Sequence, residues 1–146
     1  MNDDTKQNAH IVIIEDQEYL CRSYVDLLVW KYEFNINNIQ CFIDPREALV
    51  FLKENHQAVD VVLLDLKMPH IDGLDMLRHI RTIGDTLKII VISAFAGIES
   101  VRKAVETSEK DAEILEKAVD KPIADFSELV KMIAAAYQLR RGNNDN

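Results

Sequence analysis

The chain has 146 residues, 48% of them hydrophobic and 29% charged, and its formal net charge at pH 7 is -8. This length suits one domain with one core, and an acidic chain without a basic stripe argues against nucleic-acid binding. No apolar run approaches the roughly 20 residues that cross a bilayer, and the polar start lacks the apolar region of a signal peptide. Residues 1–9 are therefore predicted to be a loose arm.

Strands and helices alternate from the first apolar run onward. His10–Asp16 is rich in Ile and Val and ends in acids, which is typical of a buried strand. Apolar residues then recur at helical spacing from Glu18 to about Lys31. Ile36–Asp44 brings a turn and a second strand, and Pro45 after Asp44 has the residue type of a first helical position after an N-cap.

The same alternation continues to the end of the chain. The predicted elements are a strand in Ala58–Leu66, a helix after the turn at Asp72 and Gly73, a strand at Leu87–Ala94, a helix from Glu99 to about Glu116, a short strand in Lys117–Pro122, and a helix from near Phe126 that Gly142 ends. Because the strands are continuous apolar runs, they predict a doubly wound α/β fold, in which helices cover both faces of a parallel sheet. Residues 10–141 form this domain, and residues 142–146 are predicted to be a tail.

Two kinds of residue outside this pattern are given structural roles. Cys21 and Cys41 have neither metal-ligand nor redox spacing, so they are expected to be free, packed thiols in a reducing cytosol. Acids away from the strand ends, Asp60 among them, are expected to be helix caps, turn residues or solvated charges.

Four of the predicted strands end in short motifs that contain polar residues. The first strand ends in Glu15 and Asp16, the third in Asp65, the fourth in Ser93 and Ala94, and the fifth in Lys121 and Pro122. In a doubly wound sheet these strand ends lie at one edge, where binding sites form. Three carboxylates gathered there repel one another, and Mg²⁺ relieves that repulsion because it favours oxygen ligands. The acids Glu15, Asp16 and Asp65 therefore predict a magnesium site, with Lys121 as a further counter-charge.

This set of residues resembles the receiver domain of two-component response regulators, the CheY-like superfamily. The loop Asp65–Gly73, with the sequence DLKMPHIDG, also looks like the loop that follows the phosphoacceptor in that family. Each dipeptide alone is a weak signal, but five matches in the right order, over about Ile11 to Tyr137, are a strong one. The resemblance implies a flavodoxin-like (βα)5 sandwich with a five-stranded sheet in the order 2-1-3-4-5.

The resemblance also implies a role for each residue of the set. Asp65 would be the phosphoacceptor, and Glu15, Asp16, Asp65 and the backbone carbonyl of Lys67 would hold Mg²⁺, or Mn²⁺ in its place. Lys121, the hydroxyl of Ser93 and the backbone N–H groups of Lys67 and Ala94 would contact phosphate oxygens. The bond between Lys121 and Pro122 is a candidate cis peptide.

Partners and location follow from the same resemblance. A sensor histidine kinase or a histidine phosphotransfer protein would phosphorylate the chain in the cytoplasm, and phosphorylation would change its binding to a downstream protein target. The chain would assist its own phosphotransfer and slow dephosphorylation without being an enzyme. No direct nucleic-acid contact and no membrane insertion are expected. The cognate kinase, homodimerisation, and whether the domain stands alone or comes from a longer protein stay open.

Two features depart from the family pattern. Family members usually have Tyr or Phe three residues before the lysine of strand five, at a position that switches together with the hydroxyl of Ser93. This chain has Ala118 there, so an aromatic rotamer switch cannot work in its usual form. The stretch from Ser93 to Lys121 is also longer than usual. Both features favour an alternative, a pseudo-receiver that binds a partner protein without being switched by phosphorylation.

An enzyme on the same fold is a further alternative. A flavodoxin-like FMN site would need a loop rich in Ser, Thr and Gly after the first strand, where this chain has Glu15–Glu18, EDQE. A dehalogenase-type phosphohydrolase would need a second Asp two residues after the nucleophile, where this chain has Lys67. The chain also lacks the P-loop, GxGxxG and GxSxG patterns, so the residues favour a receiver over an enzyme.

Overall fold

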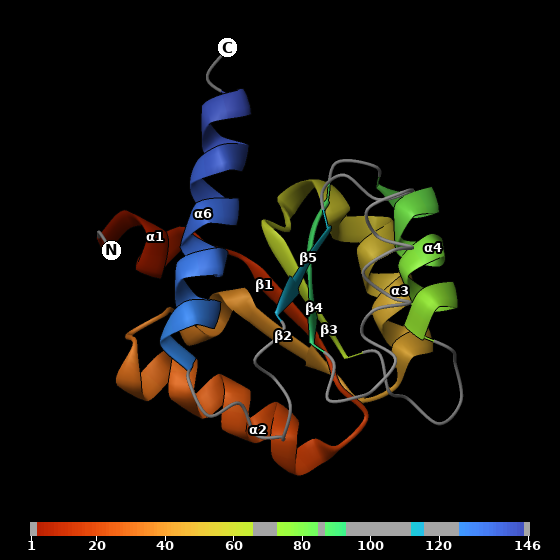
Figure 1. Cartoon of the computed structure of the whole chain (residues 1–146), viewed down its shortest axis with the longest axis horizontal. Helices are drawn as coiled ribbons and strands as arrows, with labels where there is room; N and C mark the ends of the chain where they lie inside the picture. The colour runs from red at the N-terminus through yellow and green to blue at the C-terminus, as the bar shows by residue number, and fades with distance from the viewer. Residues whose placement is uncertain (1–2, 66–72, 85–86, 93–111, 116–125, 145–146) are drawn as a thin grey trace.

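A computed structural model of the chain describes residues 3–65, 73–84, 87–92, 112–115 and 126–144 (Figure 1). For residues 65, 73–74, 112–115 and 143–144 the description is limited to the backbone. Five parallel strands form one sheet in the order β2-β1-β3-β4-β5. They are β1 (Ile11–Ile14), β2 (Ile39–Phe42), β3 (Val61–Asp65), β4 (Lys88–Ile92) and β5 (Ala112–Leu115). The predicted fold class and strand order are confirmed.

Helices cover both faces of this sheet. They are α1 (Asp3–Asn8), α2 (Glu18–Asp26), which continues as a π-helical turn over Leu27–Lys31, α3 (Pro45–Asn55), α4 (Gly73–Ile83) and α6 (Phe126–Asn144). Short 3-10 turns at Ile36–Asn38 and His56–Ala58 precede β2 and β3. Helices α2 and α6 lie on one face of the sheet, and α3 and α4 lie on the other (Figure 1).

The two faces of each strand pack against different helices. On β1, Ile11 and Ile13 belong to the core cluster under α2 and α6, whereas Val12 and Ile14 belong to the cluster under α3 and α4. All four side chains are at most 1% exposed. Successive side chains of a strand point to opposite faces, so a strand buried on both sides must be apolar at every position. Each such side chain contributes on the order of 2 kcal/mol on burial.

The start of α3 confirms the capping prediction. Asp44 has an extended backbone conformation, and its Oδ1 accepts a hydrogen bond from the backbone N–H of Arg46 at 2.9 Å. Pro45 lies in the first turn, where its missing N–H leaves no hydrogen bond unmade. Asp44 therefore anchors the connection between β2 and α3.

One predicted helix is wrong in part. Ala112–Leu115 was expected to end the helix that starts at Glu99, but it forms β5 and pairs with β4 from Ile89 to Ile92. Short apolar segments of this kind fit a helix or a strand equally well, and pairing with the open backbone edge of β4 decides between them. The strand expected in Lys117–Pro122 and the rest of that helix lie outside the described residues.

The N-terminal arm, predicted to be loose, forms helix α1 and packs against α6 (Figure 1). The hydroxyl of Tyr137 donates to Oδ2 of Asp4 at 2.7 Å, and Nε2 of Gln138 donates to Oγ1 of Thr5 at 3.0 Å. Thr5 is 1% exposed. These contacts supply the tertiary support that a six-residue helix lacks by itself. At the other end of the chain, α6 continues past Gly142 to Asn144, so the prediction that Gly142 ends the helix is also wrong.

Asp60 was expected to be a cap, a turn residue or a solvated charge, but its side chain is fully buried. Its Oδ1 accepts a hydrogen bond from Nη1 of Arg140 at 2.9 Å, and its Oδ2 accepts one from the backbone N–H of His10 at 2.8 Å. The guanidinium of Arg141 lies 3.8 Å from Oδ2. One carboxylate therefore joins the start of β1 to the end of α6.

The prediction of free thiols is wrong as well. A disulfide bond joins Cys21 of α2 to Cys41 of β2, across a sequence separation of 20 residues. The Cα atoms lie 6.1 Å apart, within the range that a disulfide requires. The spacing of the two cysteines does not predict this bond, because the cysteines meet only when α2 packs against β2 in the folded chain.

Within the residues that the structure describes, no helix combines the length and the apolar character needed to cross a membrane.

Candidate functional site

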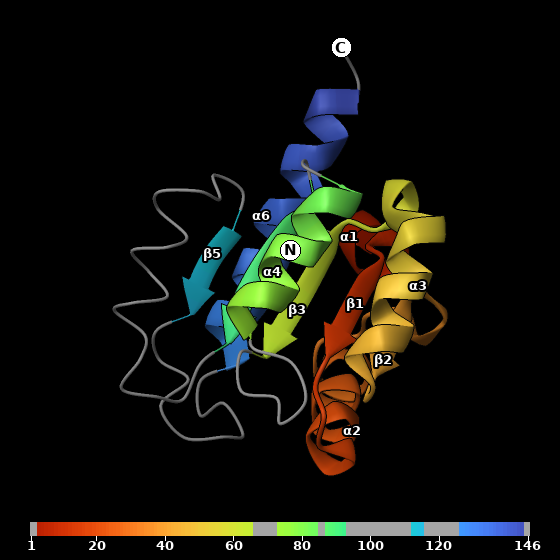
Figure 2. The same cartoon turned by 90° about the vertical axis from the view of Figure 1, so that its right-hand side faces the viewer.

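The carboxyl ends of the strands lie at one edge of the sheet, because every strand pairing is parallel (Figure 2). Ile14 of β1 pairs with Leu64 of β3, so Glu15 and Asp65, which follow them, come at the same level of the sheet. Asp65 pairs in turn with Ile92 of β4. The backbone thus brings the ends of β1, β3 and β4 together, as their apolar patterns predicted.

Glu15 is a buried carboxylate at this edge, and it is 1% exposed. Its backbone N–H donates to the carbonyl oxygen of Phe42 at 3.0 Å, and its Oε1 accepts a hydrogen bond from the N–H of Gln17 at 3.3 Å. Taking a charge out of water costs several kcal/mol unless partners replace the lost hydration. Backbone groups of β2 and of the turn into α2 therefore help to hold Glu15 in place.

Asp16 follows Glu15 and is half-buried. Its Oδ1 is buried and has no hydrogen-bond partner among the described residues. A buried oxygen in this state is costly, so it calls for a ligand or a partner. Carboxylate oxygens together with water are the ligands that Mg²⁺ prefers, so the orphaned oxygen fits a cation ligand.

Asp65 ends β3, the strand that lies between β1 and β4. The four residues before it, Val61–Leu64, are each 0% exposed, so the chain leading to Asp65 is fixed inside the core. The structure describes the backbone of Asp65 and not its side chain. Among the described side chains, no group of three potential metal ligands is complete.

The other predicted site residues lie outside the described residues. They are Lys67, Ser93, Ala94, Ala118, Lys121 and Pro122. Their roles, including the candidate cis peptide between Lys121 and Pro122, stay predictions.

Three residues around Glu15 were missed from the sequence. They are Gln17 and Phe42, which bond to Glu15 as described, and Cys21, whose sulfur lies 3.6 Å from the carbonyl oxygen of Glu15. These contacts involve backbone atoms, which every residue has, so the residue types do not indicate them. The register between β1 and β2, which pairs Ile14 with Phe42, was the one signal that could have indicated Phe42.

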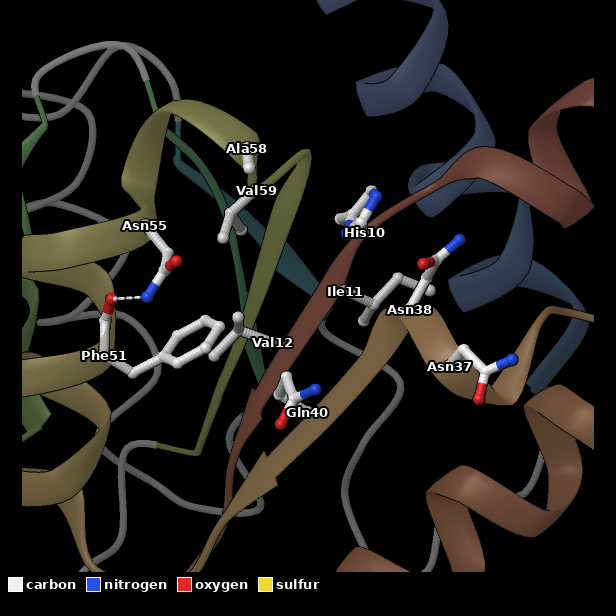
Figure 3. A pocket seen from close by; sticks show the side chains of 10 residues that line it. All are labelled: His10, Ile11, Val12, Asn37, Asn38, Gln40, Phe51, Asn55, Ala58 and Val59. Carbon is white, nitrogen blue, oxygen red and sulfur yellow. Dashed lines mark hydrogen bonds between the residues drawn. The ribbon is translucent and has the colours of Figure 1, made fainter.

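A separate pocket of about 230 Å³ lies at the opposite edge of the sheet (Figure 3). Its lining residues come from the starts of β1 and β2, from α3 and from the segment before β3, and they include His10, Asn38, Gln40, Asn55 and Val59. No predicted site residue lines it, and it is smaller than the roughly 300–1,000 Å³ of typical ligand pockets. The acidic edge, where the predicted site residues lie, is a stronger candidate site than this pocket.

Comparison with known proteins shows the family of the chain. A family model for the response regulator receiver domain matches residues 11–134. The Regulator of RpoS of Escherichia coli (strain K12) is 33% identical over 125 residues, which make up 86% of this chain and 34% of that protein. The transcriptional regulatory protein ZraR of the same strain is 27% identical over 108 residues, 73% of this chain and 23% of that protein. The chain thus spans about a quarter to a third of the length of these relatives.

Solved structures share the fold at lower sequence identity. A receiver domain protein from Clostridium thermocellum has a TM-score of 0.73 and 22% identity, with 91% of this chain and 97% of that chain covered. CheY in a CheX-CheY-BeF3-Mg complex from Borrelia burgdorferi has a TM-score of 0.70 and 21% identity, with 94% and 95% covered. At these identities the likeness concerns the fold alone.

Proposed function

Because the chain belongs to the response regulator receiver domain family, we propose that Asp65 accepts a phosphoryl group from a histidine kinase or a histidine phosphotransfer protein. The aspartyl phosphate then alters binding to a downstream protein in a cytoplasmic two-component pathway. The observation that carries this proposal is the position of Asp65. It ends the buried strand β3, at the level of the acidic pair that follows β1.

The proposed step transfers a phosphoryl group to a carboxylate oxygen of Asp65. That oxygen attacks phosphorus in line with the N–P bond of a phosphohistidine, and the bond breaks as the imidazole nitrogen keeps the electron pair. Burial of Val61–Leu64 supports this step because it fixes the strand backbone that leads to the nucleophile. The chain acts here as a phosphoacceptor that assists its own transfer and its slow hydrolysis, and not as an enzyme with a separate substrate.

The acidic pair would hold the metal ion. Asp16 would offer its Oδ1, which has no hydrogen-bond partner among the described residues, and the buried Glu15 would assist directly or through water. Bound Mg²⁺ supplies positive charge against the charge that develops on the phosphoryl oxygens. The Borrelia burgdorferi CheY complex contains Mg, which supports Mg²⁺ as the cofactor proposed here, with Mn²⁺ as a substitute. The same complex pairs CheY with another protein, CheX, which supports a protein as the output partner.

Incubation of the chain with acetyl phosphate, followed by measurement of intact mass, tests the proposal. In the presence of Mg²⁺ we expect the mass of one phosphoryl group to be added as acetate leaves. With EDTA in place of Mg²⁺, we expect the rate of phosphoryl gain to fall by at least about 100-fold, because the carboxylates then repel acetyl phosphate. No gain with Mg²⁺ would overturn the proposal and favour a pseudo-receiver that only binds a partner.

Lys121 is the proposed partner of the phosphoryl oxygens, and Lys117 offers a matched control. Strand β5 ends at Leu115, so Lys117 follows it by two residues and Lys121 by six. Lys121 precedes a proline, as in the family motif, so Lys121→Ala is expected to slow phosphoryl gain by about 100-fold. Lys117→Ala is expected to change that rate by less than about twofold, because Lys117 does not belong to the set of residues proposed to contact the phosphoryl group. If Lys117→Ala slowed phosphoryl gain more than Lys121→Ala did, Lys117 would be the residue that contacts the phosphoryl oxygens.

A further inference from the structure

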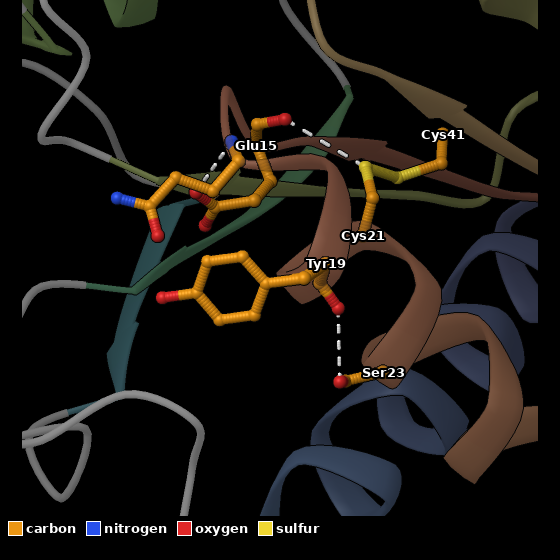
Figure 4. The surroundings of a disulfide bond; sticks show 6 residues. Glu15, Tyr19, Cys21, Ser23 and Cys41 are labelled. Atoms are coloured by element: carbon orange, nitrogen blue, oxygen red, sulfur yellow. Dashed lines mark hydrogen bonds between the residues drawn. A yellow bond between two sulfur atoms is a disulfide. The ribbon is translucent and has the colours of Figure 1, made fainter.

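We propose that Cys21 and Cys41 form a reversible thiol–disulfide site whose redox state determines how firmly the segment carrying Glu15 and Asp16 is held (Figure 4). This inference concerns the packing around the acidic pair, and it holds or fails independently of whether Asp65 accepts a phosphoryl group. In a compartment where thiols are kept reduced, a disulfide is usually transient and redox-sensing, not a permanent crosslink.

Both ends of the disulfide adjoin the backbone of Glu15. Sγ of Cys21 lies 3.6 Å from the carbonyl oxygen of Glu15 (Figure 4). Cys41 is followed by Phe42, whose carbonyl oxygen accepts the N–H of Glu15 at 3.0 Å. The crosslink therefore ties α2 to β2 on the two sides of this one residue. A change at either sulfur acts directly on the segment that carries the acidic pair.

The two cysteines differ in their exposure to solvent. Cys21 is 4% exposed, whereas Cys41 is partly exposed in the edge strand β2. Thiol–disulfide exchange depends on which sulfur an incoming thiolate can reach, so the more exposed residue, Cys41, is the proposed point of attack. Cys21 is then the leaving group and takes up a proton in its buried site.

The redox step balances with glutathione as the partner. On oxidation, the two thiols lose two protons and two electrons and form one S–S bond, while one glutathione disulfide is reduced to two thiols. On reduction, a glutathione thiolate attacks Sγ of Cys41, the Cys21–Cys41 bond breaks, and a second glutathione thiolate releases Cys41 from the mixed disulfide. The reduced Cys21 S–H can donate to the carbonyl oxygen of Glu15, whereas the disulfide sulfur has no proton to donate.

Equilibration of the full chain in buffers from fully reduced to fully oxidised glutathione tests the proposal. After acid quench, trapping with maleimide and intact mass report the thiols, and hydrogen exchange reports the backbone of residues 15–21. We expect the disulfide to form and break within this range. We expect exchange of residues 15–21 to be about tenfold slower in the disulfide form, because the crosslink restrains local opening.

Cys41→Ala is the control, because it removes the thiol of the partly exposed residue and leaves Cys21 in place. In this variant, hydrogen exchange of residues 15–21 is expected to be the same in fully reduced and in fully oxidised glutathione. Two results would overturn the proposal. One is a pair that stays oxidised in reduced glutathione, or stays reduced in oxidised glutathione. The other is equal exchange of residues 15–21 in the two forms of the wild type.

Discussion

Replacement of Asp65 by Asn is expected to abolish the gain of phosphoryl mass from acetyl phosphate and Mg²⁺. An amide has nearly the shape of a carboxylate but lacks its nucleophilic, charged oxygen, so it cannot form the acyl phosphate. The fold should tolerate the change, because strand β3 is held by Val61–Leu64, which are 0% exposed. Intact mass and unfolding temperature, measured on the same sample, separate loss of chemistry from loss of structure.

Asp75→Asn is the matched control for this experiment. Asp75 lies near the start of α4, and its 57%-exposed side chain pairs with Arg78 at 3.2 Å. Exposed pairs of this kind contribute little, so the variant should gain phosphoryl mass at the wild-type rate. A gain on Asp65→Asn equal to that of the wild type would show that another residue is the acceptor.

Replacement of Asp60 by Ala is expected to lower the free energy of unfolding by about 3 kcal/mol or more, which is typical of breaking a buried ion pair. The change removes the acceptor for Arg140 and for the backbone N–H of His10. Arg140, whose side chain is 24% exposed, then loses its partner at 2.9 Å. For a chain of this size the loss corresponds to a fall in melting temperature of roughly 10 °C.

Urea denaturation followed by circular dichroism measures this effect, and Asp75→Ala serves as the control. The control removes a surface pair and should change the free energy of unfolding by less than about 1 kcal/mol. If Asp60→Ala were no more destabilising than Asp75→Ala, the contacts of Asp60 with β1 and α6 would contribute little to the free energy of unfolding.

Much of the fold was predictable because local pattern and tertiary role agree. The apolar runs of β1, β3 and β4 are buried on both sides, so their residue types alone indicate a covered parallel sheet. The cap at Asp44 was predictable for a similar reason, since its hydrogen bond to Arg46 spans two residues. The carboxylates at the ends of β1 and β3 were found because the strand ends could be located.

Predictions failed where the deciding contact is distant in sequence. Cys21 and Cys41 are 20 residues apart, and Arg140 reaches Asp60 across 80 residues. Ala112–Leu115 has a pattern that suits either a helix or a strand, and the open edge of β4 settles it. Helix α1 depends on Tyr137 and Gln138 of α6, at the other end of the chain.

By itself, the sequence determined the alternation of strands and helices and the placing of Glu15, Asp16 and Asp65 at strand ends. Hydrophobic periodicity and strand-end acids are local properties, so they can be read without coordinates. Only the tertiary structure decided that Glu15 is buried against Phe42, that Oδ1 of Asp16 has no partner among the described residues, and that a disulfide lies beside them. These features depend on which surfaces meet when the chain packs. Those surfaces come from segments that are distant in the sequence, so local sequence patterns do not reveal the contacts.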